Sequence, residues 1–201
     1  MTIKKLWIPA LCLLLFSCKN EPRKIIVYSN KGAVIDKEAK TITEKDKSGH
    51  LENSLDYSDN VTLELNGPGG NKSLQFPDPG YYIVNAKAAD TIIGGYQKFS
   101  TAGEAKRSYT TEDIQRSVDS LKNLVAGNTS GSSSTFFILP YSSAKITANT
   151  NAVIIGPYHK ISSIAAEDGQ EPEVYRFYSI KEVRETLENL EKIGQPEVSG
   201  Q

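Results

Sequence analysis

Hydrophobic residues along this chain follow three patterns, each typical of a different structural element. Near the N-terminus, an uncharged, leucine-rich run covers Leu6 to Phe16. Short apolar or alternating runs recur between residues 24 and 178, as expected of β-strands. Two longer segments, 109–124 and 178–193, space their apolar residues three and four positions apart, which predicts amphipathic helices. The pattern therefore predicts strands and helices behind an N-terminal apolar segment.

Part of this pattern occurs twice. Residues 92–100 read Ile-Ile-Gly-Gly-Tyr-Gln-Lys-Phe-Ser, and residues 154–162 read Ile-Ile-Gly-Pro-Tyr-His-Lys-Ile-Ser, identical at six of nine positions. An apolar run precedes each segment, at 81–84 and at 136–139, and a predicted helix follows each. Such a recurrence indicates an internal duplication.

The order of these elements predicts an α+β fold. Each repeat, at 81–126 and at 135–194, reads strand, strand, helix. The resulting order, ββα-ββα, is a circular permutation of the ferredoxin-like order, so we expect an antiparallel sheet with two helices on one face. An α+β sandwich without duplication is the alternative.

Both predicted helices carry sequence signals at their ends. Ser179 and Glu182 match a capping box, as do Thr110 and Asp113, and Gly194 is placed to end the second helix. These signals predict where each helix begins and where the second one ends.

Residues 24–80 lack a helix pattern, so a β-rich segment is expected in front of the repeats. Strands are predicted at 24–28 and 61–65, and a hairpin at 33–43. Residues 46–60 are polar and are expected to form a loop.

The N-terminal run follows Lys4 and Lys5 and ends in Leu15-Phe16-Ser17-Cys18. Spanning a bilayer takes about 20 apolar residues, so this shorter run is predicted to be an export signal. Its end resembles the lipobox of bacterial lipoproteins. An ordinary secretory signal that happens to end at a cysteine is the alternative.

The resemblance implies that residues 1–17 are removed and that Cys18 carries acyl chains such as palmitate. Residues 18–23 would then be a tether, and Lys19 favours sorting to the outer membrane of the cell envelope. The bilayer is thus an expected partner, reached through the acylated Cys18.

Composition narrows the possible functions. With Cys12 in the signal and Cys18 lipidated, no thiol remains for a disulfide, a metal or a nucleophile. Without the signal, 21 basic residues face 24 acidic ones, so nucleic-acid binding is not expected. His50 and His159 lack ligand-like spacing, and we expect neither a metal nor a cofactor.

No catalytic motif is evident. The segment 67–73 resembles a phosphate-binding loop only superficially, because Asn71 replaces the glycine before the lysine and no helix follows, so a hairpin loop is expected there. A Gly-x-Ser-x-Gly motif is missing, and a carboxylate pair is defined only in space. No catalytic residue is therefore predicted.

The repeated Gly-x-Tyr-x-Lys motif is the main candidate for a binding surface. Its three side chains would share one face of a strand, and the duplication would join both copies into one surface with His159 at its edge. The alternative is that glycine and tyrosine serve strand packing alone. The candidate residues are Gly94, Tyr96, Lys98, Gly156, Tyr158, His159 and Lys160.

Asp90-Thr91-Ile92 resembles an O-glycosylation acceptor of some Gram-negative groups, which makes Thr91 a candidate site; an ordinary turn is the alternative.

Taken together, the sequence predicts an envelope lipoprotein, without catalysis, that binds a protein partner or a glycan through 81–194. A hydrolase of envelope glycan or peptide, and a structural subunit of an envelope complex, are the alternatives. Residues 195–201 are expected to be a tail.

Overall fold

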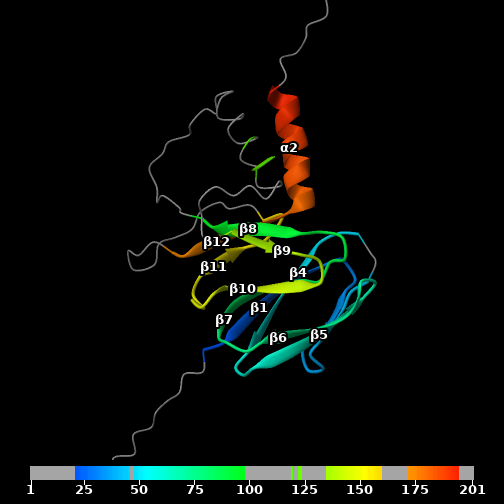
Figure 1. Cartoon of the computed structure of the whole chain (residues 1–201), viewed down its shortest axis with the longest axis vertical. Coiled ribbons are helices and arrows are strands. Elements are labelled where there is room, and N and C mark those ends of the chain that lie inside the picture. Colours follow the sequence, from blue (N-terminus) through cyan, green and yellow to red (C-terminus); the bar gives the residue numbers. More distant parts are fainter. Residues whose placement is uncertain are drawn as a thin grey trace, which may run out of the picture.

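The structure, a computed structural model, describes residues 21–45, 48–97, 119, 122–123, 135–159 and 172–194. In this part of the chain, 12 strands form three four-stranded sheets, and the helix α2 (Ile180–Gly194) follows the last strand. The sheets are stacked as layers, with α2 beyond the third (Figure 1).

The central sheet has the strand order β10 (Ser142–Thr147), β7 (Gly80–Asn85), β1 (Arg23–Ser29), β4 (Leu51–Tyr57). Its two middle strands, β1 and β7, are parallel, and nearly all their residues are buried. A strand covered on both faces cannot alternate apolar with polar residues. This explains the continuous apolar runs at 24–28 and 81–84.

The N-terminal sheet covers one face of the central sheet. Its strand order is β2 (Val34–Asp36), β3 (Thr41–Thr43), β5 (Val61–Gly67), β6 (Gly70–Phe76). Residues of β5 alternate between buried and exposed, because its outer face is open to solvent. The core between the two sheets includes Ile25, Val27, Val84, Leu63, Leu65 and Phe76.

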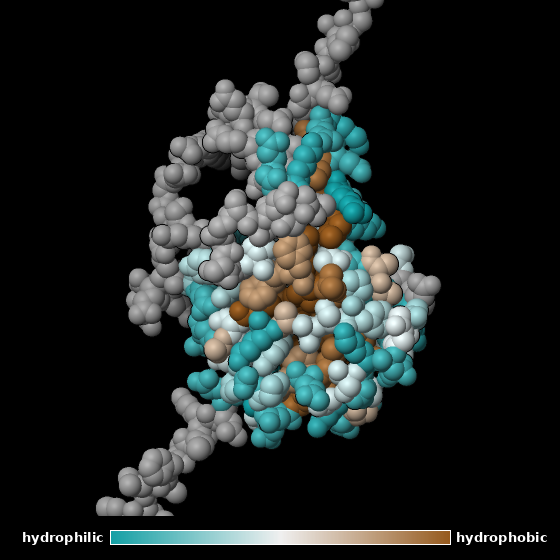
Figure 2. Space-filling view, viewed as in Figure 1, coloured by the Kyte–Doolittle hydropathy of each residue, from teal (hydrophilic) through white to brown (hydrophobic). Residues whose placement is uncertain are grey.

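The C-terminal sheet covers the other face. Its strand order is β11 (Val153–Ile155), β12 (Val174–Ser179), β8 (Ile92–Tyr96), β9 (Thr135–Ile138). A second core fills this interface and includes Ile26, Ile83, Ile92, Ile138 and Phe177. In the face shown in Figure 2, apolar side chains gather over this layer, next to the hydrophilic surface of α2.

The predicted α+β fold with a duplicated ββα unit is wrong, because the described chain is mainly β and builds three sheets. The two apolar runs that precede the similar segments become β7 and β9, which belong to different sheets. The similar segments themselves also differ: 92–96 forms β8, whereas the second strand, β11, ends at Ile155.

Proline at position 157 accounts for this last difference. Gly95 pairs within β8, on both sides of the strand. Pro157 occupies the matching position, and it has no backbone N–H to donate to a ladder. The chain therefore turns after Gly156, and Tyr158 takes a positive φ of 65°.

The second predicted helix is confirmed as α2. Its capping box forms as expected: the Glu182 N–H donates to Ser179 Oγ (3.0 Å), and the Ser179 N–H donates to Glu182 Oε2 (3.4 Å). Most of the first predicted helix, 109–124, lies outside the described residues. Asp119, Lys122 and Asn123 have helical backbone, and Lys122 Nζ lies 2.7 Å from Glu191 Oε1.

Several strand predictions in the N-terminal segment are confirmed. Residues 33–43 form the β2–β3 hairpin, and 67–73 lie in the β5–β6 hairpin. The loop expected at 46–60 is wrong, because 51–57 form β4.

The signal with Cys18 and the tail at 195–201 lie outside the described residues. Among the helices of the described part, none has both the length and the hydropathy to cross a membrane.

Candidate functional site

A cleft of about 870 Å³ opens where the central sheet meets the N-terminal end of α2. Residues 48–50 before β4, the β7–β8 loop (87–91) and Tyr158 form part of its lining. One side of α2 completes it with Ile180, Lys181, Arg184, Glu185 and Glu188. We call it the β4–α2 cleft.

The β7–β8 loop is held in place by the buried side chain of Asn85. Asn85 Nδ2 donates to Asp90 O (2.7 Å) and to Ile138 O (3.0 Å), and its Oδ1 accepts from the Lys87 N–H (3.2 Å). At its end, Thr91 O accepts from the Ile180 N–H (3.0 Å), which ties the loop to α2. The lining residues on this loop are therefore fixed by backbone contacts.

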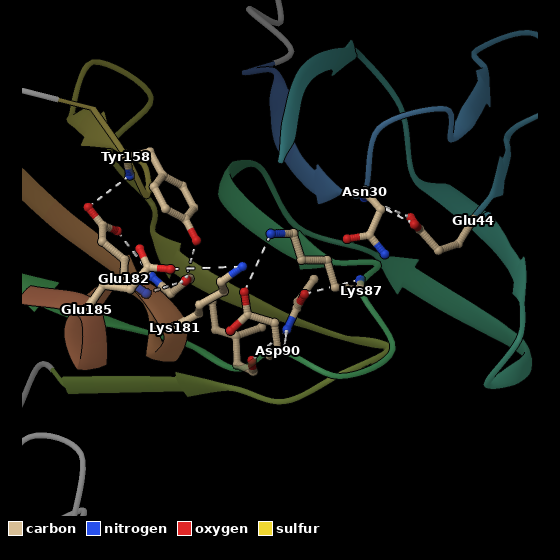
Figure 3. A network of polar contacts seen from close by, with 11 residues as sticks. Asn30, Glu44, Lys87, Asp90, Tyr158, Lys181, Glu182 and Glu185 are labelled. Carbon is tan, nitrogen blue, oxygen red and sulfur yellow. Dashed lines mark hydrogen bonds and ion pairs between the residues drawn. The ribbon is translucent and has the colours of Figure 1, made fainter. Parts of the chain in front are cut away.

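Lys87 and Asp90 form an ion pair on this loop, with Nζ and Oδ2 3.5 Å apart. The Lys87 side chain is almost buried, and Asp90 is only slightly more exposed. Figure 3 shows this pair between Asn30 on one side and Lys181 on the other. On α2, Lys181 and Glu185 form a second, more exposed pair at 3.9 Å.

Tyr158 is held in its left-handed backbone conformation by the helix cap. Its N–H donates to Glu182 Oε1 (3.0 Å), and its Oη lies 3.1 Å from Ser179 Oγ. Arg176 Nη2 lies 3.8 Å from the same Glu182 oxygen. A positive φ at a non-glycine residue costs about 1–3 kcal/mol, so these contacts are what maintain it.

His50 packs between two tyrosines. Its ring centroid lies 5.1 Å from that of Tyr158 and 5.5 Å from that of Tyr28. Burial lowers the pKa of His50 to about 4, and the Lys87 and His159 charges act in the same direction. Neither ring nitrogen has a hydrogen-bond partner among the described residues. The imidazole is thus neutral at physiological pH.

Glu52 and His159 form a second polar group, near Tyr28 and Gly156. Glu52 Oε2 lies 3.2 Å from His159 Nε2. A Cβ added at Gly156 would contact this Glu52 oxygen and would lie 2.6 Å from Tyr28 Oη. A side chain at position 156 would therefore require Glu52 and Tyr28 to shift. Burial raises the pKa of the Tyr28 hydroxyl, which stays protonated.

The structure separates the two copies of the Gly-x-Tyr-x-Lys motif. β12 lies between β8 and β11 and runs antiparallel to the first and parallel to the second. Tyr96 lies opposite Tyr175 near the start of β12, whereas Tyr158 contacts Ser179 at its end. The two tyrosines thus lie at opposite ends of the C-terminal sheet, so among the described residues the two copies do not share one surface.

The remaining candidates lie in several places. Gly94 is buried in β8, where a Cβ would lie 2.5 Å from Phe177 Cδ1. Thr91 is half-buried in the lining of the cleft. Lys98 and Lys160 lie outside the described residues.

Sequence reasoning missed His50, Lys87 and Arg184 as site residues. His50 and Lys87 lie in loops and Arg184 lies on a helix, and no spacing rule connects them. The two histidines, far apart in the sequence, are brought close enough to interact electrostatically. In the described ranges no three His, Cys, Asp or Glu side chains gather closely enough to hold a metal ion.

No protein-family model, curated protein or solved structure matches this chain.

Proposed function

We propose that this protein is a lipid-anchored lipoprotein of the cell envelope, in the outer membrane, that binds a ligand in the β4–α2 cleft without catalysis. The anchor rests on the Leu15–Cys18 motif and on Lys19 after it. The binding role rests on the cleft, which joins an aromatic side chain to polar groups held in fixed positions.

The size and lining of the cleft support binding of a small ligand. Ligand pockets measure about 300–1,000 Å³ and combine apolar surface with a few well-placed polar groups. The β4–α2 cleft has this volume, with Ala88, Ala89 and Ile180 as apolar lining beside Tyr158. A folded protein partner needs a broader face of about 800 Å² per side, so a glycan or a peptide suits this site better.

The acids of the cleft favour binding over hydrolysis. Two of its three acids are in ion pairs, Asp90 with Lys87 and Glu185 with Lys181; the third is Glu188. Burial raises the pKa of Glu44, but this carboxylate accepts from the Asn30 N–H (3.1 Å) and does not line the cleft. The carboxyl whose pKa burial raises, a feature that acid catalysts share, thus lies away from the cleft.

Replacing Cys18 with Ala tests the anchor. Cells grown with an alkyne-tagged palmitate should label the native chain, and the Cys18→Ala chain should carry no label and leave the membrane fraction. Labelling of the variant at the native level would refute the predicted lipidation.

A tryptophan placed in the cleft tests the binding role. Trp7 is the only tryptophan of the sequence and precedes Cys18, so the processed chain would contain none. Tyr158→Trp then puts one fluorophore in the cleft. Tyr96→Trp is the matched control, since the two tyrosines are 44 % and 46 % exposed and only Tyr158 lines the cleft.

The lipidated chain in detergent micelles is titrated with uncharged oligosaccharides, acidic oligosaccharides and short peptides. We expect one class to change the emission of Tyr158→Trp in a saturable manner, with no change in Tyr96→Trp. Equal responses in the two variants, or no response to any class, would refute the cleft as a ligand site.

A further inference from the structure

We infer that the ligand of the β4–α2 cleft is an uncharged saccharide whose ring packs against Tyr158 and whose hydroxyl groups bind the ion pairs beside it. The inference rests on the proposed ligand-binding function and names the chemical class of the ligand.

Charge balance in the cleft argues for an uncharged ligand. Its lining holds three cationic and three anionic side chains: Lys87, Lys181 and Arg184 against Asp90, Glu185 and Glu188. His50, also in the lining, is neutral. An acidic or basic ligand would lose its hydration without meeting a net opposite charge, which is unfavourable.

The ion pairs supply donors and acceptors side by side. Lys87 Nζ lies next to Asp90 Oδ2 on the β7–β8 loop, and Lys181 Nζ lies next to Glu185 Oε1 on α2. A hydroxyl group both donates and accepts hydrogen bonds. Two adjacent hydroxyls of a sugar ring can therefore bind one ammonium and one carboxylate at the same time, and these bonds to charged partners are the stronger kind.

Two ion pairs in the same lining can bind hydroxyl groups at different edges of one sugar ring. One pair comes from the loop that follows the central sheet, and the other comes from the first turns of α2. The tie between Thr91 O and the Ile180 N–H fixes the loop to the helix, so the two pairs keep their spacing. Such a fixed arrangement lowers the entropy cost of binding.

Tyr158 offers the flat surface that a sugar ring needs. It is 44 % exposed although its backbone N–H, its hydroxyl and its ring are all in contact with neighbours. Its unfavourable φ marks it as a residue held in position by its surroundings. The tyrosine side chain has an apolar ring and a polar hydroxyl. It therefore suits a sugar, which has apolar ring faces and polar hydroxyl groups around its edge.

Isothermal titration calorimetry on the full lipidated chain in micelles tests the inference. The probes are uncharged tri- and tetrasaccharides of glucose, mannose and N-acetylglucosamine, the corresponding uronic acid oligomers, and neutral pentapeptides. The variants are Tyr158→Ala, Tyr158→Phe, Asp90→Asn and, as a control outside the cleft, Tyr96→Ala, each checked for native circular dichroism.

We expect at least one uncharged saccharide to bind more tightly than its acidic counterpart. Tyr158→Ala should weaken it at least tenfold, Tyr158→Phe should retain most of the affinity because the ring remains, and Tyr96→Ala should have no effect. Asp90→Asn should weaken binding as well, since the amide is a poorer acceptor than the carboxylate. Raising the ionic strength tenfold should leave the affinity unchanged, since screening acts on charged ligands.

Preferred binding of an acidic oligomer or a peptide, abolished by Tyr158→Ala, would overturn the inference and leave the cleft as a ligand site. Saccharide binding that survives Tyr158→Ala and Asp90→Asn would also overturn it, because the ligand would then lie elsewhere. Absence of binding by every probe would overturn both the inference and the proposed function.

Discussion

Glu182 links three features of the site through a single carboxylate. One oxygen accepts from the Tyr158 N–H and lies near Arg176, and the other accepts from the Ser179 N–H in the helix cap. The same side chain therefore begins α2 and holds the aromatic residue of the cleft. The sequence pattern predicted this capping contact only as the start of a helix. At the scale of single residues, the same carboxylate also holds Tyr158 in the cleft.

His50 should make stability depend on pH. Its pKa falls from 6.5 in the unfolded chain to about 4 in the folded protein, mainly through burial. Between these values the unfolded chain binds a proton that the folded protein does not, so acidification favours unfolding. We expect the free energy of unfolding, measured in urea, to fall as the pH drops from 6.5 towards 4.

A His50→Phe variant is the control, because it keeps a ring between Tyr28 and Tyr158 and cannot titrate. Its stability should fall less over the same pH range. Glu44 acts in the opposite direction, since its raised pKa stabilises the folded state at low pH, and it is present in both proteins. Identical pH profiles for the two proteins would contradict a neutral, buried His50.

At the scale of elements, α2 shows that nearby residues are enough to predict where a helix begins and ends. Ser179, Glu182 and Gly194 were expected to bound the second helix, and it runs from Ile180 to Gly194. Strand β4 shows the reverse. Of its seven residues only Leu55 is buried, because β4 lies at the edge of the central sheet, so its sequence reads as a polar loop.

Ser179→Ala tests the helix cap. Ser179 Oγ accepts the Glu182 N–H and contacts Tyr158 Oη, so the variant loses an N-cap and frees one tyrosine hydroxyl. We expect a loss of about 1 kcal/mol in the free energy of unfolding. Urea denaturation followed by circular dichroism measures it.

Thr186→Ala is the matched control within the same helix. Its hydroxyl donates only to Glu182 O (2.9 Å) on an exposed face, and alanine is the better helix former. This variant should be as stable as the native protein or slightly more stable. A larger loss from Thr186→Ala than from Ser179→Ala would contradict the capping role.

At the scale of the whole molecule, the central sheet takes part in both hydrophobic cores. Ile25 and Val27 point to one core, and Ile26 and Tyr28 point to the other. Loss of either outer sheet would therefore expose one side of β1 and β7. The cleft is lined by loops at the ends of central and C-terminal strands and by α2, so its lining depends on how these elements pack together.

The protein should unfold in a single transition, and mutations in either core should lower the free energy of that transition. Leu65→Ala weakens the core under the N-terminal sheet, and Phe177→Ala weakens the core under the C-terminal sheet; both side chains are buried. Each should cost about 2–5 kcal/mol. Tyrosine fluorescence and circular dichroism in urea should give coincident transitions for both variants. Two separated transitions in either variant would show that the layers unfold independently.

Local sequence patterns were enough to predict several elements: the α2 cap, the β2–β3 and β5–β6 hairpins, and the strands at 24–28 and 61–65. Spacing, capping residues and turn residues act over a few positions, so they can be read directly. The proposed anchor rests on a short linear motif alone.

The stacking of the sheets, the pairing of strands and the composition of the cleft became visible only in the three-dimensional structure. The similar segments at 92–100 and 154–162 suggested a duplication, yet Pro157 ends one strand where Gly95 continues the other. Strand pairing joins residues far apart in the chain, such as β1 with β7, and no local pattern encodes that choice. His50, Lys87 and Arg184 meet in one cleft because loops at the end of the central sheet lie beside α2, which a linear sequence does not display.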